Sequence, residues 1–121
     1  MAHTDIPKNV RQLIARHIDS VQQVEILALL RGDPEREWTV AEISRSLHIA
    51  PNSCSEWLEA FAAAKLVART ESGFKHSDRG GADHLVECYS RRRLAVIDSI
   101  YNKPSPSIQS FSDAFRLRKD D

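Results

Sequence analysis

Along most of this chain apolar residues recur at spacings of three and four, the pattern of helices that bury one face. The first such stretch predicts an N-terminal helix within residues 1–19. Ser20 and Gln23 have the spacing of a capping box, so a second helix is expected to begin there. Because this second helix is apolar on most of its faces, we expect it at the centre of the core, ending at Gly32-Asp33-Pro34.

Two further helical segments follow, separated by only a few residues. Thr39 and Glu42 form a second capping-box pattern at the start of the first segment. The other is expected to begin near Asn52 or Ser53, directly after a tight connection that contains proline. A short helix, a brief turn and a second helix together make a helix-turn-helix.

The period of the apolar pattern changes after the helix-turn-helix. Residues 66–70 and 73–76 have strand character and flank a glycine-containing turn, which predicts a small hairpin. A helix-turn-helix followed directly by such a hairpin is the winged-helix arrangement, which we assign to residues 20–78. The predicted fold is therefore mainly α with a two-stranded β wing.

The C-terminal part predicts one long helix and a separate tail. Residues 82–102 have apolar positions at helical spacing over a length of about 30 Å, longer than so small a domain can cover. Two prolines then separate the tail, residues 103–121, in which Ile108, Phe111 and Phe115 predict a short amphipathic helix. We expect this tail to dock on its own domain, on a dimer mate or on a separate protein partner.

Within residues 20–77 three motifs follow one another at close spacing. They are Thr39-Val40-Ala41-Glu42-Ile43-Ser44 with Leu47, then Asn52-Ser53-Cys54-Ser55, then Leu58 and Leu66-Val67-Ala68-Arg69. In this order they resemble the winged helix-turn-helix of bacterial transcriptional regulators of the multiple-antibiotic-resistance type. The resemblance implies a winged-helix fold and a role as a small transcriptional regulator.

The chain departs from that family pattern around the helix expected to contact DNA. Lys65 stands where glycine is usual, and the helix has no Lys or Arg before it. It carries Glu56 and Glu59 instead. An acidic helix keeps a second hypothesis open, a winged-helix adaptor that binds another protein and does not bind DNA.

DNA binding predicts a specific set of contacts. In a helix-turn-helix the N-terminal part of the second helix meets base edges in the major groove. The hydrogen-bonding side chains expected on that surface are Asn52, Ser53, Ser55 and Glu56. Phosphate neutralisation dominates affinity, and the basic groups available for it are Arg45, Arg69, Lys75, His76 and Arg79. The predicted partner is double-stranded DNA, with the wing on the backbone.

Composition limits the remaining classes. The chain has 121 residues, of which 41% are apolar and 28% charged, which fits one globular domain. Because 17 Lys and Arg balance 17 Asp and Glu, only a local patch can attract nucleic acid. No apolar run approaches the roughly 20 residues of a membrane span, and the N-terminus has no signal-peptide core. We therefore expect a cytoplasmic protein with no membrane partner.

No catalytic motif is present, so we expect no enzyme activity, no cofactor and no metal. His84 and Cys88 lie four residues apart on one helix face, but Cys54 and His76 could join them as ligands only if the fold brought them close. A helix N-terminus lowers a thiol pKa. Glu56, two residues after Cys54, works against that effect, so we interpret Cys54 as a core residue. Trp38 and Trp57 are interpreted as core anchors.

The long helix predicts a homodimer, because exposed apolar stripes mark interfaces and a two-fold pair is the commonest closed assembly. The predicted interface residues are Leu13, Ile14, Leu85, Tyr89, Val96, Ile97 and Ile100. On the same helix, residues 91–93 are three arginines that point about 100° apart. We interpret them as solvated or salt-bridged, with Glu87 or Asp98 as expected partners of Arg93.

Overall fold

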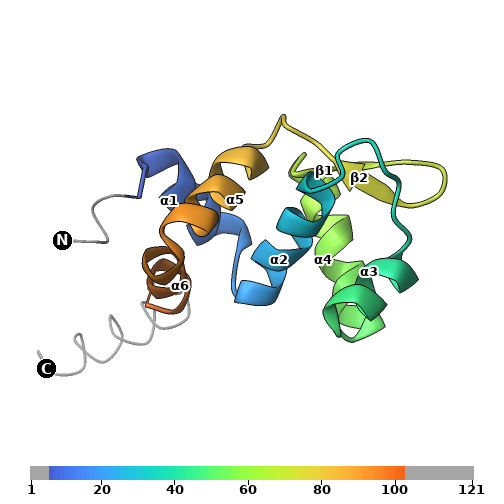
Figure 1. The fold of residues 1–121 in the computed structure, drawn as a ribbon, viewed down its shortest axis with the longest axis horizontal. Helices are drawn as coiled ribbons and strands as arrows, with labels where there is room; N and C mark the ends of the chain where they lie inside the picture. The colour runs from blue at the N-terminus through green and yellow to red at the C-terminus, as the bar shows by residue number, and fades with distance from the viewer. Residues whose placement is uncertain (1–5, 103–121) are drawn as a thin grey trace, which may run out of the picture.

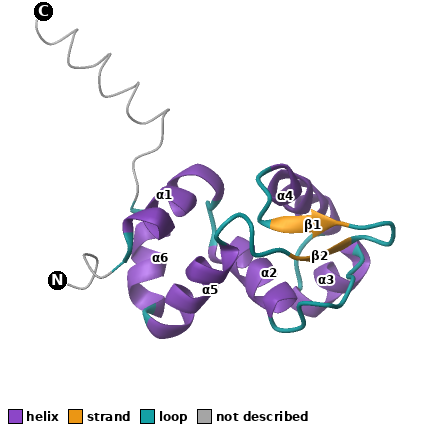
Figure 2. Cartoon of the chain, turned by 90° about the horizontal axis from the view of Figure 1, so that it is seen from above, coloured by secondary structure: helices purple, strands orange, loops and turns teal. Residues whose placement is uncertain are grey.

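The computed structural model describes residues 6–102. Its elements are α1 (Lys8–His17), α2 (Val21–Arg31), α3 (Val40–Leu47), α4 (Pro51–Ala63), β1 (Val67–Arg69), β2 (Phe74–His76), α5 (Ala82–Arg91) and α6 (Arg93–Tyr101). Helices α2 to α4 and the hairpin form a winged part, and α1, α5 and α6 form a helical body at the other end of the molecule (Figure 1). A view turned by 90° shows the same separation (Figure 2). The mainly α fold with a two-stranded wing is confirmed.

Local capping decides where the first helices of the winged part begin. The Oε1 atom of Gln23 accepts a hydrogen bond from the backbone N–H of Ser20 at 3.0 Å, directly before α2. At the start of α3, Thr39 Oγ1 accepts from the N–H of Glu42 at 3.1 Å, and the Glu42 carboxylate accepts from the N–H of Thr39 at 2.9 Å. This backbone hydrogen bond from Thr39 lowers the pKa of the Glu42 carboxyl. Both predicted helix starts are confirmed.

Helix α2 lies between the two parts, as its apolar sequence predicts. Val24, Ile26, Leu27 and Leu30 are fully buried, and α2 contacts α3, β2 and α5. A helix buried on several sides needs apolar residues around most of its circumference. Among the described residues, no helix is both long enough and apolar enough to cross a membrane.

The hairpin pairs Val67 with His76 and Arg69 with Phe74 in antiparallel register. A third chain segment joins it, because Trp38 exchanges two backbone hydrogen bonds with Phe74, at 2.7 and 2.8 Å. The sequence did not predict this pairing, since a single residue has no periodicity to detect. Trp38 is also buried in the core, as its interpretation as an anchor requires, whereas Trp57 is half-buried.

The prediction of one long helix over residues 82–102 is wrong. The backbone leaves the helical conformation at Arg92 (φ −133°, ψ 57°), and α5 and α6 pack against each other and against α1. This bend lets Leu85 on α5 and both Val96 and Ile100 on α6 reach the protein's own core. A straight helix would carry one end of that apolar stripe past the domain into water.

This bend changes the basis of the dimer prediction. Four of the predicted interface side chains lie in the chain's own core and leave no surface for a partner in this conformation: Ile14, Leu85, Val96 and Ile100. Leu13, Tyr89 and Ile97 are only half-buried. An uncovered stripe along the long helix therefore no longer supports a homodimer, which stays a prediction. The predicted tail helix and its protein partner lie outside the described residues.

The arginines at the bend are exposed and locally engaged. Arg91 forms an ion pair with Glu87 at 3.5 Å. Arg93 does not pair with Glu87 or Asp98 but lies over the ring of Tyr89, 5.1 Å from its centroid. Such contacts at exposed sites stabilise by less than about 1 kcal/mol, so these arginines do not determine the fold.

Candidate nucleic-acid interface

Helix α4 presents one face to solvent along its whole length. Its exposed residues are spaced three or four apart along that face and are Asn52, Glu56, Glu59, Ala60 and Ala63, with Pro51 at the helix start. The opposite face, through Cys54, Leu58 and Phe61, is buried in the core. Ser53 and Ser55 are half-buried at its edges. The helix begins at Pro51, one or two residues before the predicted start at Asn52 or Ser53, because proline suits the first helical position.

The turn that positions α4 is closed by hydrogen bonds rather than by glycine. His48 ends α3 in the left-handed conformation (φ 58°). The carbonyl of Ser44 accepts from the N–H of Ile49 at 3.0 Å, while the Ser44 hydroxyl donates to the Ile49 carbonyl at 2.5 Å. These bonds hold the start of α4 at a defined angle to α3. Arg45 is exposed on α3, with no acidic side chain within ion-pair distance among residues 6–102.

Two of the predicted basic contacts are already engaged within the protein. Arg69 forms an ion pair with Glu59 of α4 and lies over the ring of Phe74, 5.4 Å from its centroid. His76 Nε2 lies 3.1 Å from Asp83 Oδ1, and its side chain is only 11% exposed. Lys75 is half-buried and has no such partner among the described residues.

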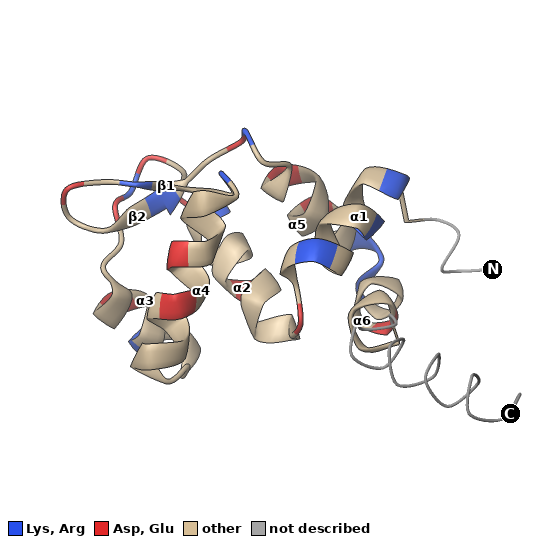
Figure 3. Cartoon of the chain, turned by 180° about the vertical axis from the view of Figure 1, so that it is seen from behind, with Lys and Arg blue, Asp and Glu red and all other residues tan. Residues whose placement is uncertain are grey.

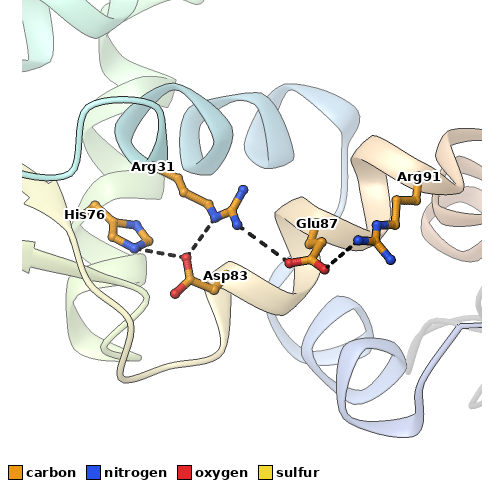
Figure 4. A network of polar contacts seen from close by, with 5 residues as sticks. All are labelled: Arg31, His76, Asp83, Glu87 and Arg91. Atoms are coloured by element: carbon orange, nitrogen blue, oxygen red, sulfur yellow. Dashed lines mark hydrogen bonds and ion pairs between the residues drawn. The ribbon is translucent and has the colours of Figure 1, made fainter.

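His76 is the end of a longer chain of polar contacts that joins the winged part to the helical body (Figure 4). Arg31 Nε donates to Asp83 Oδ1 at 2.9 Å, and a second nitrogen of Arg31 lies 3.7 Å from Glu87. Glu87 in turn pairs with Arg91. The sequence did not predict this network, since Arg31 and Asp83 lie 52 positions apart and no local pattern connects them.

The predicted contact residues therefore fall into two places. Asn52, Ser53, Ser55 and Glu56 lie in the N-terminal half of α4 and follow Arg45 closely in the chain. Arg69, Lys75 and His76 instead line an open groove of about 830 Å³ between the C-terminal half of α4, the hairpin and the loop after α2, here called the α4–wing groove. Its acidic and basic residues are Glu35, Glu59, Lys65, Arg69, Lys75, His76, Asp78 and Arg79.

The two cysteines lie in separate environments. Cys54 is completely buried, and burial raises the pKa of its thiol, so the N-terminal half of α4 does not activate it. Cys88 is half-buried, and burial raises its thiol pKa as well. His84, one turn before it, is hydrogen-bonded to Asn9 at 3.0 Å. Residues 6–102 contain no group of three or more His, Cys, Asp or Glu side chains that could hold a metal ion.

Comparison with known proteins identifies the fold. No protein-family model and no curated protein matches the chain. Three similar solved structures are BpsR of Bordetella bronchiseptica, the multiple antibiotic-resistance repressor MarR of Listeria monocytogenes, and a MarR family protein of Mycobacterium tuberculosis. Their TM-scores are 0.53, 0.53 and 0.52, and they are 18%, 17% and 17% identical to this chain. The matches cover 98%, 93% and 91% of this chain and 86%, 78% and 85% of the respective structures.

The fold is that of MarR-family regulators. The resemblance seen in the sequence is thus confirmed for the fold. At 17–18% sequence identity, likeness to a solved structure establishes the fold alone.

Within this MarR-like fold, charge is divided unevenly (Figure 3). Residues 18–81, which contain the winged part, carry seven Lys and Arg against ten Asp and Glu, a net charge of −3. Residues 8–17 and 82–101, the helical body, carry six against three, a net charge of +3. DNA binding by the winged part must therefore depend on where individual cations lie, because its net charge repels phosphate.

Proposed function

We propose that this protein is a winged-helix transcriptional regulator that binds double-stranded DNA with the N-terminal half of α4 in the major groove. The observation that supports this proposal is the exposed pair Asn52 and Glu56 on one face of α4, with the unpaired cation Arg45 shortly before them. The MarR-like fold adds support, since BpsR is a protein whose DNA binding is regulated by 6-hydroxynicotinic acid.

The chemistry of this surface suits base recognition. Asn52 has the donor and acceptor that match adenine, and the Glu56 carboxylate can accept from the amino group of cytosine. Glu56 forms no ion pair within residues 6–102, so its carboxylate is available. Ser53 and Ser55 can donate to or accept from either kind of base edge. Arg45 supplies a phosphate contact that fixes the orientation of the helix.

The first prediction separates base contacts from phosphate contacts. Ser55→Ala and Glu56→Ala should change which sequences are selected from a pool of random duplexes, because these side chains would contact base edges. Arg45→Ala should weaken binding to all sequences alike and reduce the slope of log affinity against log salt by about 0.9. Lys8→Ala on α1, at the far end of the molecule, is the control and should change neither. If the unmodified protein shifts no duplex at low salt, the proposal fails.

A homodimer is part of this proposal, with a revised interface. Leu94, Ile97 and Tyr101 are spaced three and four apart on one face of α6, and Leu94 and Tyr101 are 81% and 59% exposed. Exposed large apolar side chains gathered on one helix face are typical of an interface.

The second prediction concerns this face. Leu94→Lys should convert a dimer to a monomer in sedimentation while the domain stays folded by circular dichroism, because the side chain touches little of its own domain. Ser90→Lys, at an exposed position of α5, is the matched control and should leave the dimer intact. The interface is contradicted if the unmodified protein is a monomer. It is also contradicted if the unmodified protein is a dimer and the Leu94→Lys variant is a dimer too.

A second candidate function rests on the acidity of α4. Its exposed face has two carboxylates and no cation, which suits a basic protein segment better than a phosphate backbone. In that case the protein is a winged-helix adaptor, and the DNA-binding assay above distinguishes the two functions.

A further inference from the structure

The α4–wing groove contains three cations that no acid of the described chain neutralises. Of its basic residues, Arg69 pairs with Glu59 and His76 pairs with Asp83. Lys65, Lys75 and Arg79 have no acidic side chain within 4.0 Å among residues 6–102. With Glu59 already neutralised, only Glu35 and Asp78 oppose them within the groove lining.

Lys65 occupies a backbone position that favours glycine. The N–H of Leu66 donates to the carbonyl of Phe61 at 2.8 Å, and the N–H of Lys65 donates to that of Ala62 at 3.1 Å. This hydrogen-bond pair ends α4 in a Schellman motif, in which the residue at Lys65 must be left-handed, and its φ is 67°. A side chain at such a position strains the backbone. Folding alone therefore favours glycine over lysine at this position.

Lys75 stands on β2 opposite Ala68, whose small side chain leaves room above the strand. Lys75 is half-buried, a costly location for a charge without an acid partner. The turn of the hairpin, residues 70–73, holds Glu71 and no Lys or Arg. The wing tip therefore offers no cation to a minor groove, and the cations of the wing region lie in the α4–wing groove instead.

The α4–wing groove lies between the two elements that the proposed function places on DNA, α4 and the hairpin. If α4 occupies a major groove and the hairpin lies over the neighbouring minor groove, the strand that separates the two grooves must pass between α4 and the hairpin. We propose that the α4–wing groove holds this stretch of phosphate backbone, and that Lys65, Lys75 and Arg79 contact its phosphates. This inference rests on the proposed function and identifies where the backbone binds.

The test uses a substitution whose effects on stability and binding have opposite signs. Lys65→Gly should raise the melting temperature by about 4 °C, because it removes the strain of the left-handed position. It should at the same time reduce the salt slope of DNA binding by about 0.9, because it removes one phosphate contact. Lys65→Gln should reduce the slope equally without raising the melting temperature, and Lys75→Gln should reduce it by the same amount. Lys8→Gln on α1 is the matched control.

The outcomes distinguish this inference from the proposed function. If the unmodified full-length protein binds duplex DNA and neither Lys65→Gly nor Lys75→Gln changes the salt slope of binding, the groove assignment is overturned. DNA binding itself then stands. A protein that binds no duplex at low salt overturns both. A more stable Lys65→Gly variant with weaker, less salt-dependent binding supports the assignment, because a purely structural residue would not weaken binding while raising stability.

Discussion

Gly73→Ala will destabilise the protein by about 3 kcal/mol, the largest effect expected of a change this small. A Cβ at Gly73 would lie 2.0 Å from the carbonyl oxygen of Trp38 and 2.9 Å from its carbonyl carbon. Neither atom belongs to a flexible side chain, so the backbone itself must move. That movement separates Trp38 from Phe74, whose two hydrogen bonds hold the loop before α3 against the wing.

Denaturant unfolding followed by circular dichroism measures this loss. Gly32→Ala is the matched control, because a Cβ there would meet only carbonyl oxygens at 3.4 and 3.5 Å and the backbone is helical (φ −64°). We expect Gly32→Ala to stay within about 0.5 kcal/mol of the unmodified protein. Equal midpoints for Gly73→Ala and Gly32→Ala would show that Trp38 does not pack as the structure describes.

Glu59→Gln will tighten DNA binding about tenfold at low salt. The change removes one carboxylate from the exposed face of α4 and releases Arg69, which Glu59 otherwise holds in an ion pair. A released arginine at the edge of the α4–wing groove can contact a phosphate, so the salt slope should steepen by about 0.9. Stability should fall by less than about 1 kcal/mol, because both side chains are about half exposed.

A double-mutant cycle identifies the route of this effect. In an Arg69→Gln background, Glu59→Gln can no longer release a cation, so most of its gain in affinity should disappear. A gain that persists in that background would come from the lost carboxylate alone. If Glu59→Gln leaves DNA binding unchanged and instead abolishes capture of a basic peptide, the adaptor function is favoured over DNA binding.

The elements of the winged part could be predicted because their signals are local. The capping residues Thr39 and Gln23 lie within three positions of the helix starts that they determine. Glycine and proline end α2, and strand alternation around a turn predicts the hairpin. The buried centre follows as well, because a helix that is apolar on most faces has nowhere else to pack. In the same way the sequence identified Lys65 as a departure at a position where glycine is usual.

Tertiary structure alone decided how the C-terminal helices and the charged side chains are used. The apolar positions of residues 82–102 fit one long helix equally well, and the bend at Arg92 lets them pack against α1 and α2. The same holds for Arg69 and His76, which look like unpaired basic side chains in the sequence. Their acids, Glu59 and Asp83, come close only when helices and strands pack together. Residue spacing reports contacts along one element, whereas burial and ion pairs depend on contacts between elements.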